Sequence, residues 1–498
     1  MRDRKDLIGL AFCSGQSLTE KREFIVNRIW RLLALLLSFS LVAAACGSDA
    51  EDAAETATDA VTESDDAMEE EDSMEEEDAM EEEDHSDDDA MEEDAMEEDA
   101  MEEESATVEA APSCTGETDG TLQIGGLLPQ TGNLAFLGPP EEAGAALAVE
   151  EMNAAGGVLG NDVVFSPGDS SDNGDVANQT VDRHLSDGVD AILGAASSGV
   201  SFTVIDKITG ACVIHFSPAN TSPDFTNYDD DDLYFRTAPS DILQGRVLAD
   251  LIVAEGNSTV ALMALQDPYG EGLLNFTVAP LEEQGAEIVE QFTYDAAAQN
   301  FDAEVQRIVA ADPEAIVVIG FDETSSILTG LFENGFTPDA KNIYLVDGNI
   351  GNALGEAFSD PGILSGIKGT LPAAEITSDF QERLLAVDPD LIDFSYGPET
   401  YDAAIIIGLS AVAAGSDDPA AMAAVMNGVT RDGEKCTSFA DCVALLEAGT
   451  DIDYDGPSGP LAFGPAGEPT EASFAILSYA ADSNTIDGDA TVYQFAAL

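Results

Sequence analysis

Two short runs rich in hydroxyl-bearing and small residues stand where apolar segments end. Ser197-Ser198-Gly199 lies between the apolar run 191–194 and the helical pattern 200–208, and Ala219-Asn220-Thr221 follows the apolar run 213–216. Backbone N–H groups at a helix start lack intrahelical partners, and a neighbouring hydroxyl adds another donor. We therefore expect both runs to hold a carboxylate. The alternative is that their hydroxyls only cap helices.

These runs belong to a longer alternation of apolar segments and helical patterns. The expected strands are 122–128, 191–194, 213–216, 259–265, 287–293, 315–319 and 342–346, and the expected helices are 141–153, 200–208, 241–254, 271–284 and 302–311. Such alternation predicts parallel sheets covered by helices on both faces. The pattern breaks near 237–240, and the 388 residues after position 110 are too many for one core. We therefore expect two α/β lobes, with a ligand cleft at the carboxyl ends of their strands.

Two residues of the second lobe stand at element ends that face such a cleft. Asp347 follows the expected strand 342–346, and Tyr269 precedes the expected helix 271–284. Tyr269 is placed to close over a ligand, whereas an isolated aspartate in a loop is usually just solvated.

Eight short motifs follow one another in this part of the chain. They are Ile124-Gly-Gly-Leu-Leu-Pro-Gln-Thr-Gly132, Gly138 with Ala143-Gly144, Glu151-Met-Asn-Ala-Ala-Gly-Gly157, Gly188-Val-Asp-Ala-Ile-Leu-Gly194, Ser217-Pro-Ala-Asn-Thr-Ser-Pro223, Phe235-Arg-Thr-Ala-Pro-Ser240, Tyr269-Gly-Glu-Gly272 and Gly459-Pro-Leu-Ala-Phe463. In this order, from about Leu122 to the C-terminus, they resemble the leucine/isoleucine/valine-binding protein family. Members of that family are solute receptors of ABC importers with the type I periplasmic-binding fold.

The resemblance implies two doubly wound parallel-sheet lobes joined by a three-segment hinge. The crossings would fall near 238–241, 370–374 and 459–464. One lobe would combine 121–239 with 374–458, and the other 240–372 with 459–498.

The resemblance also implies a ligand site for an α-amino acid head. The expected ligand-binding residues are Ser197, Ser198, Ala219, Asn220, Thr221, Tyr269, Phe321 and Asp347. Asp347 falls where the family places an acidic partner for the ammonium group. Leu137 and Phe321 stand where better-known members carry tyrosines, so the resemblance supports an amino-acid-like ligand more than leucine itself. Receptors for urea, short amides and aromatic acids belong to the same family.

The N-terminal segment resembles a secretory signal peptide. The apolar run 32–41 follows basic residues and precedes Val-Ala-Ala-Ala-Cys46, which resembles the lipobox of bacterial lipoproteins. We expect residues 1–45 to be the signal peptide, with translation starting near Val26, and Cys46 to carry the lipid. The alternative is an ordinary cut near Ala45. We therefore expect the protein on the outer face of the cell membrane, held by its lipid.

Residues 46–112 are a low-complexity acidic stretch. The sequence carries 99 acidic and 17 basic residues, of which 33 acidic and no basic ones lie in 49–110. Such composition predicts a disordered, extended tether, with weak cation binding as a lesser role. Residues 111–498 hold 62 acidic and 10 basic residues, a surface that repels nucleic acid.

Four cysteines remain beyond the leader and the anchor. Cys436 and Cys442 are close in sequence, and we expect a disulfide between them in an oxidising compartment. Cys114 and Cys212 are then the only other pair, with free thiols as the alternative.

The sequence does not support a calcium loop, a phosphate loop or a catalytic serine. Asp451-Ile-Asp-Tyr-Asp-Gly456 resembles the start of a calcium loop, but the twelfth position is Ala462 rather than glutamate. A phosphate loop and a Gly-x-Ser-x-Gly nucleophile are absent from the sequence. We expect that the protein is not an enzyme and binds neither a metal nor a cofactor. We expect a monomeric solute receptor whose partners are ABC permease subunits. A ligand sensor for a signalling partner is the alternative.

Overall fold

The computed structural model describes residues 112–116 and 118–498. The expected signal peptide, Cys46 and all but the last residue of the acidic tether lie outside the described residues. Within the described ranges, none of the helices has both the length and the apolar character that a bilayer crossing needs.

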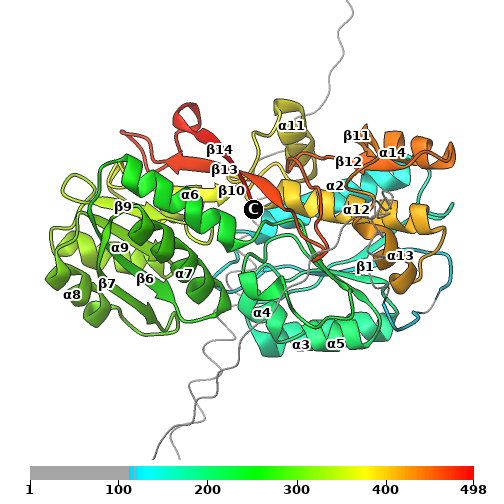
Figure 1. Ribbon diagram of the computed structural model, residues 1–498, viewed down its shortest axis with the longest axis horizontal. Coiled ribbons are helices and arrows are strands. Elements are labelled where there is room, and N and C mark those ends of the chain that lie inside the picture. The colour runs from blue at the N-terminus through cyan, green and yellow to red at the C-terminus, as the bar shows by residue number, and fades with distance from the viewer. Residues whose placement is uncertain (1–111, 117) are drawn as a thin grey trace, which may run out of the picture. The chain divides into compact units, whose positions relative to one another are not determined.

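The first lobe is built on a five-stranded parallel sheet (Figure 1). In sheet order its strands are β2 (Val164–Ser166), β1 (Gln123–Leu127), β3 (Ala191–Gly194), β4 (Ile214–Ser217) and β5 (Tyr234–Arg236). Its helices are α2 (Gly138–Ala154), α3 (Gly174–Asp187), α4 (Ser198–Phe202) and α5 (Ile205–Gly210). Where one helix was expected over 200–208, the structure has the two short helices α4 and α5, separated by Thr203 and Val204.

Buried residues cover both faces of this first sheet. Successive strand residues belong to different clusters, because side chains alternate across a strand. Ala191 and Leu193 join the cluster packed against α2, whereas Ile192 joins the cluster that contains Val181 and Ile208 of α3 and α5. The predicted helix–sheet–helix layering is therefore present.

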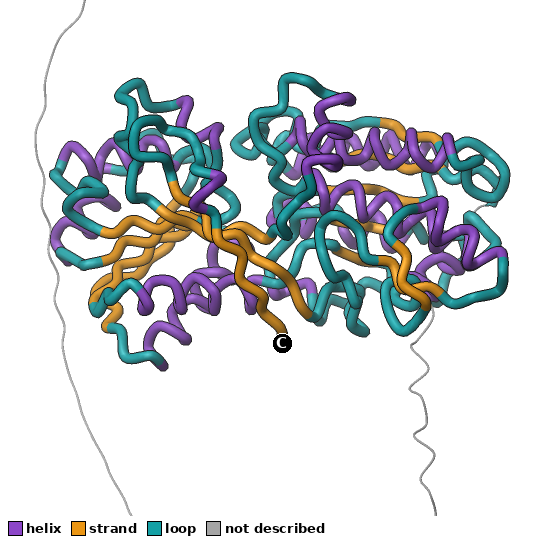
Figure 2. Tube along the Cα trace, turned by 90° about the horizontal axis from the view of Figure 1, so that it is seen from above, coloured by secondary structure: helices purple, strands orange, loops and turns teal. Residues whose placement is uncertain are grey.

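The second lobe holds a seven-stranded sheet. In sheet order its strands are β14 (Val492–Ala497), β13 (Glu471–Ser478), β10 (Lys368–Pro372), β9 (Asn342–Leu345), β8 (Ala315–Ile319), β6 (Thr259–Leu265) and β7 (Glu287–Tyr294). Its helices are α6 (Asp241–Ala254), α7 (Pro268–Glu283), α8 (Asp302–Ala311), α9 (Thr324–Glu333) and α10 (Asn352–Glu356). Figure 2 shows these helices on both sides of the strands.

The second sheet is not wholly parallel. Strands β10, β9, β8, β6 and β7 run parallel, but β13 is antiparallel to β10 and β14 is antiparallel to β13. The segment 479–491, which includes only the short 3-10 helix Gly488–Ala490, joins β13 to β14 without a crossover helix, and such a connection gives an antiparallel pair. The expected parallel sheet is therefore present and is extended at this edge by two antiparallel strands.

The remaining elements pack on the first lobe. They are α11 (Ser378–Val387), α12 (Gly397–Ala414), α13 (Pro419–Met426), α14 (Phe439–Glu447) and the two-stranded ribbon of β11 (Glu434–Cys436) and β12 (Ile452–Tyr454). Residues of α12 share one buried cluster with residues of α2 and of the first sheet.

The third passage between the lobes lies later than expected. Leu461 and Phe463 are buried in the first lobe's core, where Phe463 lies 6.2 Å from Phe216 between ring centroids. The chain enters the second sheet only at Glu471. The expected boundary at 459 is therefore corrected to the segment 464–470.

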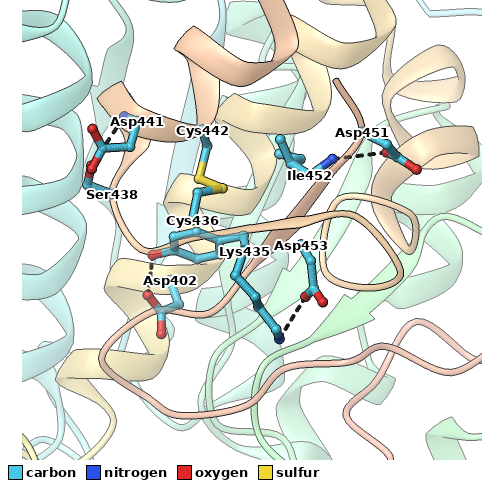
Figure 3. The surroundings of a disulfide bond; sticks show 10 residues. Asp402, Lys435, Cys436, Ser438, Asp441, Cys442, Asp451, Ile452 and Asp453 are labelled. Atoms are coloured by element: carbon cyan, nitrogen blue, oxygen red, sulfur yellow. Dashed lines mark hydrogen bonds and ion pairs between the residues drawn. A yellow bond between two sulfur atoms is a disulfide. The ribbon is translucent and has the colours of Figure 1, made fainter. Parts of the chain in front are cut away.

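Both disulfides are present. Cys436 and Cys442 are bridged with a Cα–Cα distance of 5.3 Å, and Figure 3 shows this bond between the ribbon and α14. Cys114 and Cys212 are bridged with a Cα–Cα distance of 5.8 Å, so the free-thiol alternative is wrong.

The carboxylates of the calcium-like run bind groups of the protein. Figure 3 shows Asp453 bound to the Nζ of Lys435 and the carboxylate of Asp451 accepting a hydrogen bond from the N–H of Ile452. Asp455 also binds the Nζ of Lys435. These carboxylates bind the protein itself. The described residues contain no group of three or more His, Cys, Asp or Glu that fits a metal ion.

Candidate ligand site between the two lobes

The first expected run begins a short helix. Ser197 is the N-cap of α4, and its Oγ accepts a hydrogen bond of 3.3 Å from the N–H of Val200. The Oγ of Ser198 accepts a bond of 3.3 Å from the N–H of Ser222, which joins the two expected runs. Because α4 has only five residues, its dipole is small, and any anion held here depends on individual N–H and O–H groups.

The second expected run is a braced loop after β4. The Nδ2 of Asn220 donates to the carbonyls of Ala195 and Ala196 at 3.0 and 2.9 Å, and its Oδ1 accepts from Tyr234. The side chain of Asn220 therefore shapes the loop. The Oγ1 of Thr221 is buried and has no hydrogen-bond partner of regular geometry in the part of the chain that the structure describes.

A buried ion pair holds this loop from behind. The Nη1 of Arg236 donates to the carbonyls of Asn220 and Ser222 at 3.1 and 2.8 Å, and its Nε donates to Glu468 at 2.8 Å. Arg236 belongs to β5, whereas Glu468 lies in the third passage between the lobes. The guanidinium therefore ties the loop to the hinge.

Tyr269 reaches the site because of how α7 begins. Asp267 caps this helix by accepting a bond of 2.7 Å from the N–H of Gly270, and Pro268 supplies a fixed first turn. The Tyr269 ring stacks on Phe321 with centroids 5.5 Å apart, and its hydroxyl donates to Asp347 Oδ1 at 2.8 Å. Three of the expected site residues are therefore in one group.

Asp347 lies at the centre of this group. Besides Tyr269, the Nε2 of Gln244 donates to its Oδ1 at 2.8 Å and the hydroxyl of Tyr396 donates to its Oδ2 at 2.7 Å. Burial raises the pKa of Asp347, and these three hydrogen bonds oppose that rise. The net effect is a pKa above its usual range for this carboxyl group, which is only 4% exposed.

Asp241 was missed by the sequence reasoning. It is the first residue of α6, is fully buried, and neither of its carboxylate oxygens has a hydrogen-bond partner of regular geometry among the described residues. Burial and the neighbouring charge of Asp347 raise its pKa well above the usual range, and a hydrogen-bonding contact with the side chain of Thr221 opposes that rise.

Residues of the two lobes are in contact around these groups. A Cβ placed on Gly272 of α7 would lie 2.6 Å from Cδ of Pro223 in the first lobe, and one on Gly199 would lie 3.1 Å from Asp267 Oδ2. Leu137 and Ala219 of the first lobe share a buried cluster with Tyr269 and Phe321. This is a closed arrangement, with a cavity of about 420 Å³ at its edge lined by Ser197, Asp267 and Phe321 among others.

The architecture is that of the type I periplasmic-binding fold, with two α/β lobes, three passages and polar residues between them. Residues 121–483 match the model of the family described as "Periplasmic binding protein", and the chain belongs to this family. Proteins of this family are extracytoplasmic binding proteins.

Two curated relatives are similar over much of the chain. A chemotactic signal transduction system substrate-binding protein, BasB of Halobacterium salinarum, is 25% identical over 362 residues, which are 70% of this chain and 84% of the relative. A Leu/Ile/Val-binding protein homolog of Brucella abortus is 24% identical over 311 residues, 60% of this chain and 80% of the relative.

Two solved structures share the fold. The branched-chain amino acid transporter substrate-binding protein LivJ of Streptococcus pneumoniae, in complex with isoleucine, has a TM-score of 0.62 at 21% identity, covering 76% of this chain and all of LivJ. A solute-binding protein of an ABC transporter of R. palustris, in complex with 4-hydroxybenzoate, has a TM-score of 0.61 at 17% identity, covering 74% and 95% of the two chains.

Proposed function

We propose that the protein captures a branched-chain or related amino acid between its two lobes and delivers it to an ABC importer. The observation that carries this proposal is the buried carboxylate of Asp347, which accepts hydrogen bonds from residues of both lobes. A carboxylate so placed suits an ammonium group, and charge-assisted hydrogen bonds are worth about 1.5–3 kcal/mol.

The opposite side of the site suits a carboxylate. The loop 219–222 lies against the second lobe, where the carbonyl of Thr221 accepts a hydrogen bond from the N–H of Asp241, and Ser198 holds that loop in place. Ser197 takes part as a cap of α4. Ala219 and Asn220 contribute main chain rather than side chains.

Closure works by population shift. A solute that touches both lobes binds the closed state better than the open one. At saturation, it raises the closed-to-open ratio by the ratio of its affinities for the two states. The permease subunits would then recognise the closed form. We expect a monomer, held to the outer face of the membrane through a lipid on Cys46.

A second function is favoured by one relative. BasB is named as part of a chemotactic signal transduction system, and this chain spans 84% of it. The same capture would then report the solute to a signalling partner. Aromatic acids are an alternative solute class, because a neighbour in fold was solved with 4-hydroxybenzoate.

The test is a thermal-shift screen of the purified full chain against amino acids, urea, short amides and aromatic acids. A ligand at 100 times its dissociation constant adds about 2.7 kcal/mol to the stability of the folded state, which raises Tm visibly. The expected result is a shift with one or a few amino acids. A panel without any shift would contradict solute capture of this class.

The same screen on two variants locates the site. Asp347→Asn is expected to weaken amino acid binding at least tenfold, because it removes the negative charge and leaves the shape. Asp302→Asn changes an exposed aspartate in the first turn of α8 and serves as the matched control. Equal affinities for the two variants would remove Asp347 from the site.

A further inference from the structure

A cavity of about 270 Å³ lies between the edge of the second sheet and the start of α12. Leu371 of β10 pairs with Ala475 of β13, which pairs with Tyr493 of β14, so these three residues form one wall on a single face of the sheet. Ile376 and Phe394, which pack against the buried cluster of the first lobe, also line the cavity. A molecule in this cavity would therefore touch both lobes.

The cavity is distinct from the candidate ligand site but shares one side chain with its surroundings. None of the expected ligand-binding residues is among the described residues that line it. Tyr396 lines the cavity, and its hydroxyl donates to Oδ2 of Asp347 in the candidate ligand site. A molecule in the cavity would therefore contact the ligand site through Tyr396.

Glu399 is a buried acid in the lining of this cavity. It lies in the first turn of α12 and is 3% exposed. Burial raises the pKa of Glu399 to about 8, its own N–H opposes that rise, and the charge of Asp402 adds to it. Its own N–H is thus the donor that it has, and the side chains around it supply none. A buried polar group so poorly bonded costs free energy unless another donor binds it.

A second buried acid lies near Glu399. Glu141 is in the first turn of α2, is fully buried, and has no hydrogen-bond partner for either oxygen among the described residues. The starts of α2 and α12 are in contact, because a Cβ on Gly144 would overlap the carbonyl oxygen of Gly397. Burial and the charge of Glu399 raise the pKa of Glu141 well above its usual range. A helix dipole explains an acid in a first turn, but not the burial of both without outside donors.

The rest of the lining combines apolar and acidic side chains. Ile376 and Leu477 are among its apolar members. Asp393 is a further acid, and its two oxygens accept hydrogen bonds from the N–H groups of Asn352 and Ala353 at 3.1 and 3.0 Å. None of the described residues in the lining is lysine, arginine or histidine. The lining therefore suits an apolar molecule that carries a positive charge.

We propose that this cavity is a second small-molecule site, and that it takes a protonated amine on a compact apolar body. The ammonium group donates to Glu399, which unlike Asp393 has no donor from another residue, and its charge favours the ionised carboxylate. The apolar body covers the aliphatic lining. Pockets for drug-sized molecules measure about 300–1,000 Å³, so this cavity suits a smaller one. The proposal does not depend on the proposed function.

Occupancy of this site would also act on solute capture. The cavity is formed in the closed arrangement, from residues that pack against the cores of both lobes. A molecule that binds it therefore favours that arrangement over an open one. By linkage, a solute that also favours closure should then bind more tightly.

The test uses the full chain and three compounds that share a six-carbon chain. Hexylamine, hexan-1-ol and hexanoate are compared by calorimetry at pH 7 in about 0.15 M salt, which screens attraction of the amine to the acidic surface. Hexylamine is expected to bind at one site per chain, at least tenfold more tightly than the alcohol or the carboxylate. Absence of such binding, or equal binding of the amine and the alcohol, overturns the proposal.

A cavity-filling variant locates the bound amine. Ala475→Leu puts a larger side chain into the cavity and is expected to weaken hexylamine binding at least tenfold. Ala497→Leu, at an exposed position of β14, is the matched control and should leave binding unchanged. If Ala475→Leu does not fold, Ala374→Leu, at a half-buried position of the lining, takes its place. Binding that persists in the filled cavity overturns the proposed location.

Glu399→Gln tests the acid itself. The amide keeps the shape of the side chain and removes its charge, so the preference for hexylamine over hexan-1-ol is expected to fall at least fivefold. Glu282→Gln, at an exposed position of α7, should leave that preference unchanged. An unchanged preference in Glu399→Gln overturns the role of Glu399.

Solute binding in saturating hexylamine separates the two sites. The affinity for the amino acid that the thermal-shift screen identifies is expected to rise, whereas competition between the two compounds would place the amine in the candidate ligand site and overturn the proposal. Hexylamine binding without capture of any amino acid would contradict the proposed function and leave this inference intact.

Discussion

The hydroxyl of Tyr396 donates a hydrogen bond of 2.7 Å to Oδ2 of Asp347, and so joins the first lobe to the second inside the site. Tyr396 precedes α12 in a left-handed conformation, with φ at 59°, and its side chain is 1% exposed. The bond joins the residue before α12 to the end of β9, and the Tyr396 ring is part of the buried cluster that contains the second lobe's core. We therefore expect the bond to contribute to closure.

Tyr396→Phe is expected to keep the ring and lose this bond. A buried hydrogen bond to a charged group contributes about 1.5–3 kcal/mol, so the affinity should fall at least tenfold. The loss should appear mainly as faster ligand dissociation, measured by stopped flow. Tyr493→Phe, at an exposed tyrosine of β14, is the control and should leave dissociation unchanged. Identical dissociation rates for both variants would show that the bond does not hold the closed state.

The Arg236–Glu468 pair gives a prediction about stability. Both residues are buried, and removal of one leaves a buried charge without its partner. Glu468→Gln is therefore expected to lower the free energy of unfolding by about 3–5 kcal/mol. The double variant Arg236→Met/Glu468→Leu, which removes both charges, should lose less than the single one. Denaturant unfolding measures both, and a double variant worse than the single one would contradict this account.

The buried carboxyls of the first lobe predict how stability depends on pH. Burial raises the pKa of Glu399 to about 8 and those of Asp190 and Asp402 to about 7. The folded state then binds protons that the unfolded state loses above about pH 4, so stability falls as the pH rises from about 4 towards 8. Tm should be several degrees higher at pH 5 than at pH 8, at constant salt.

A variant separates this effect from general charge repulsion, which changes in the same direction. Glu399→Gln should flatten the dependence of Tm on pH, because the amide needs no proton in the folded state. Glu282→Gln, at an exposed position of α7, should leave the slope unchanged. A slope that Glu399→Gln does not alter would mean that this carboxyl is not held neutral.

Local patterns were enough to predict the α/β fold, and three of the candidate site residues that they indicated lie together in the structure. Strand–helix alternation predicted the layers, because burial on a sheet or under a helix follows a period that the sequence carries. The loops after β3 and β4 were predicted from their hydroxyls and their place at strand ends. The antiparallel strands β13 and β14 were not predicted, because they lie outside the strand–helix alternation from which the other strands were inferred.

The residues that were missed depend on the tertiary fold. Asp241 is an acidic residue in the first turn of a helix, where the helix dipole usually explains it. Tyr396 lies about 50 positions from Asp347 and meets it only when α12 packs on the first lobe. Leu461 and Phe463 are apolar and could pack in the core of either lobe. The hydrophobic pattern of the sequence therefore could not predict where the third passage between the lobes begins.

The two disulfides should differ in what they contribute. Cys114–Cys212 closes a loop across 98 positions, and Cys436–Cys442 closes one across 6. In the loop-entropy model the cost of losing a bridge grows with the logarithm of the loop length, giving about 4.7 kcal/mol for the long loop and roughly 2 kcal/mol for the short one. Cys114→Ala/Cys212→Ala should therefore lower the free energy of unfolding more than Cys436→Ala/Cys442→Ala, as measured in urea without reductant. The short bridge joins β11 to α14 beside buried residues of the first lobe. If its removal proved the more costly of the two, packing around the ribbon and not chain entropy would be the main contribution of that bond.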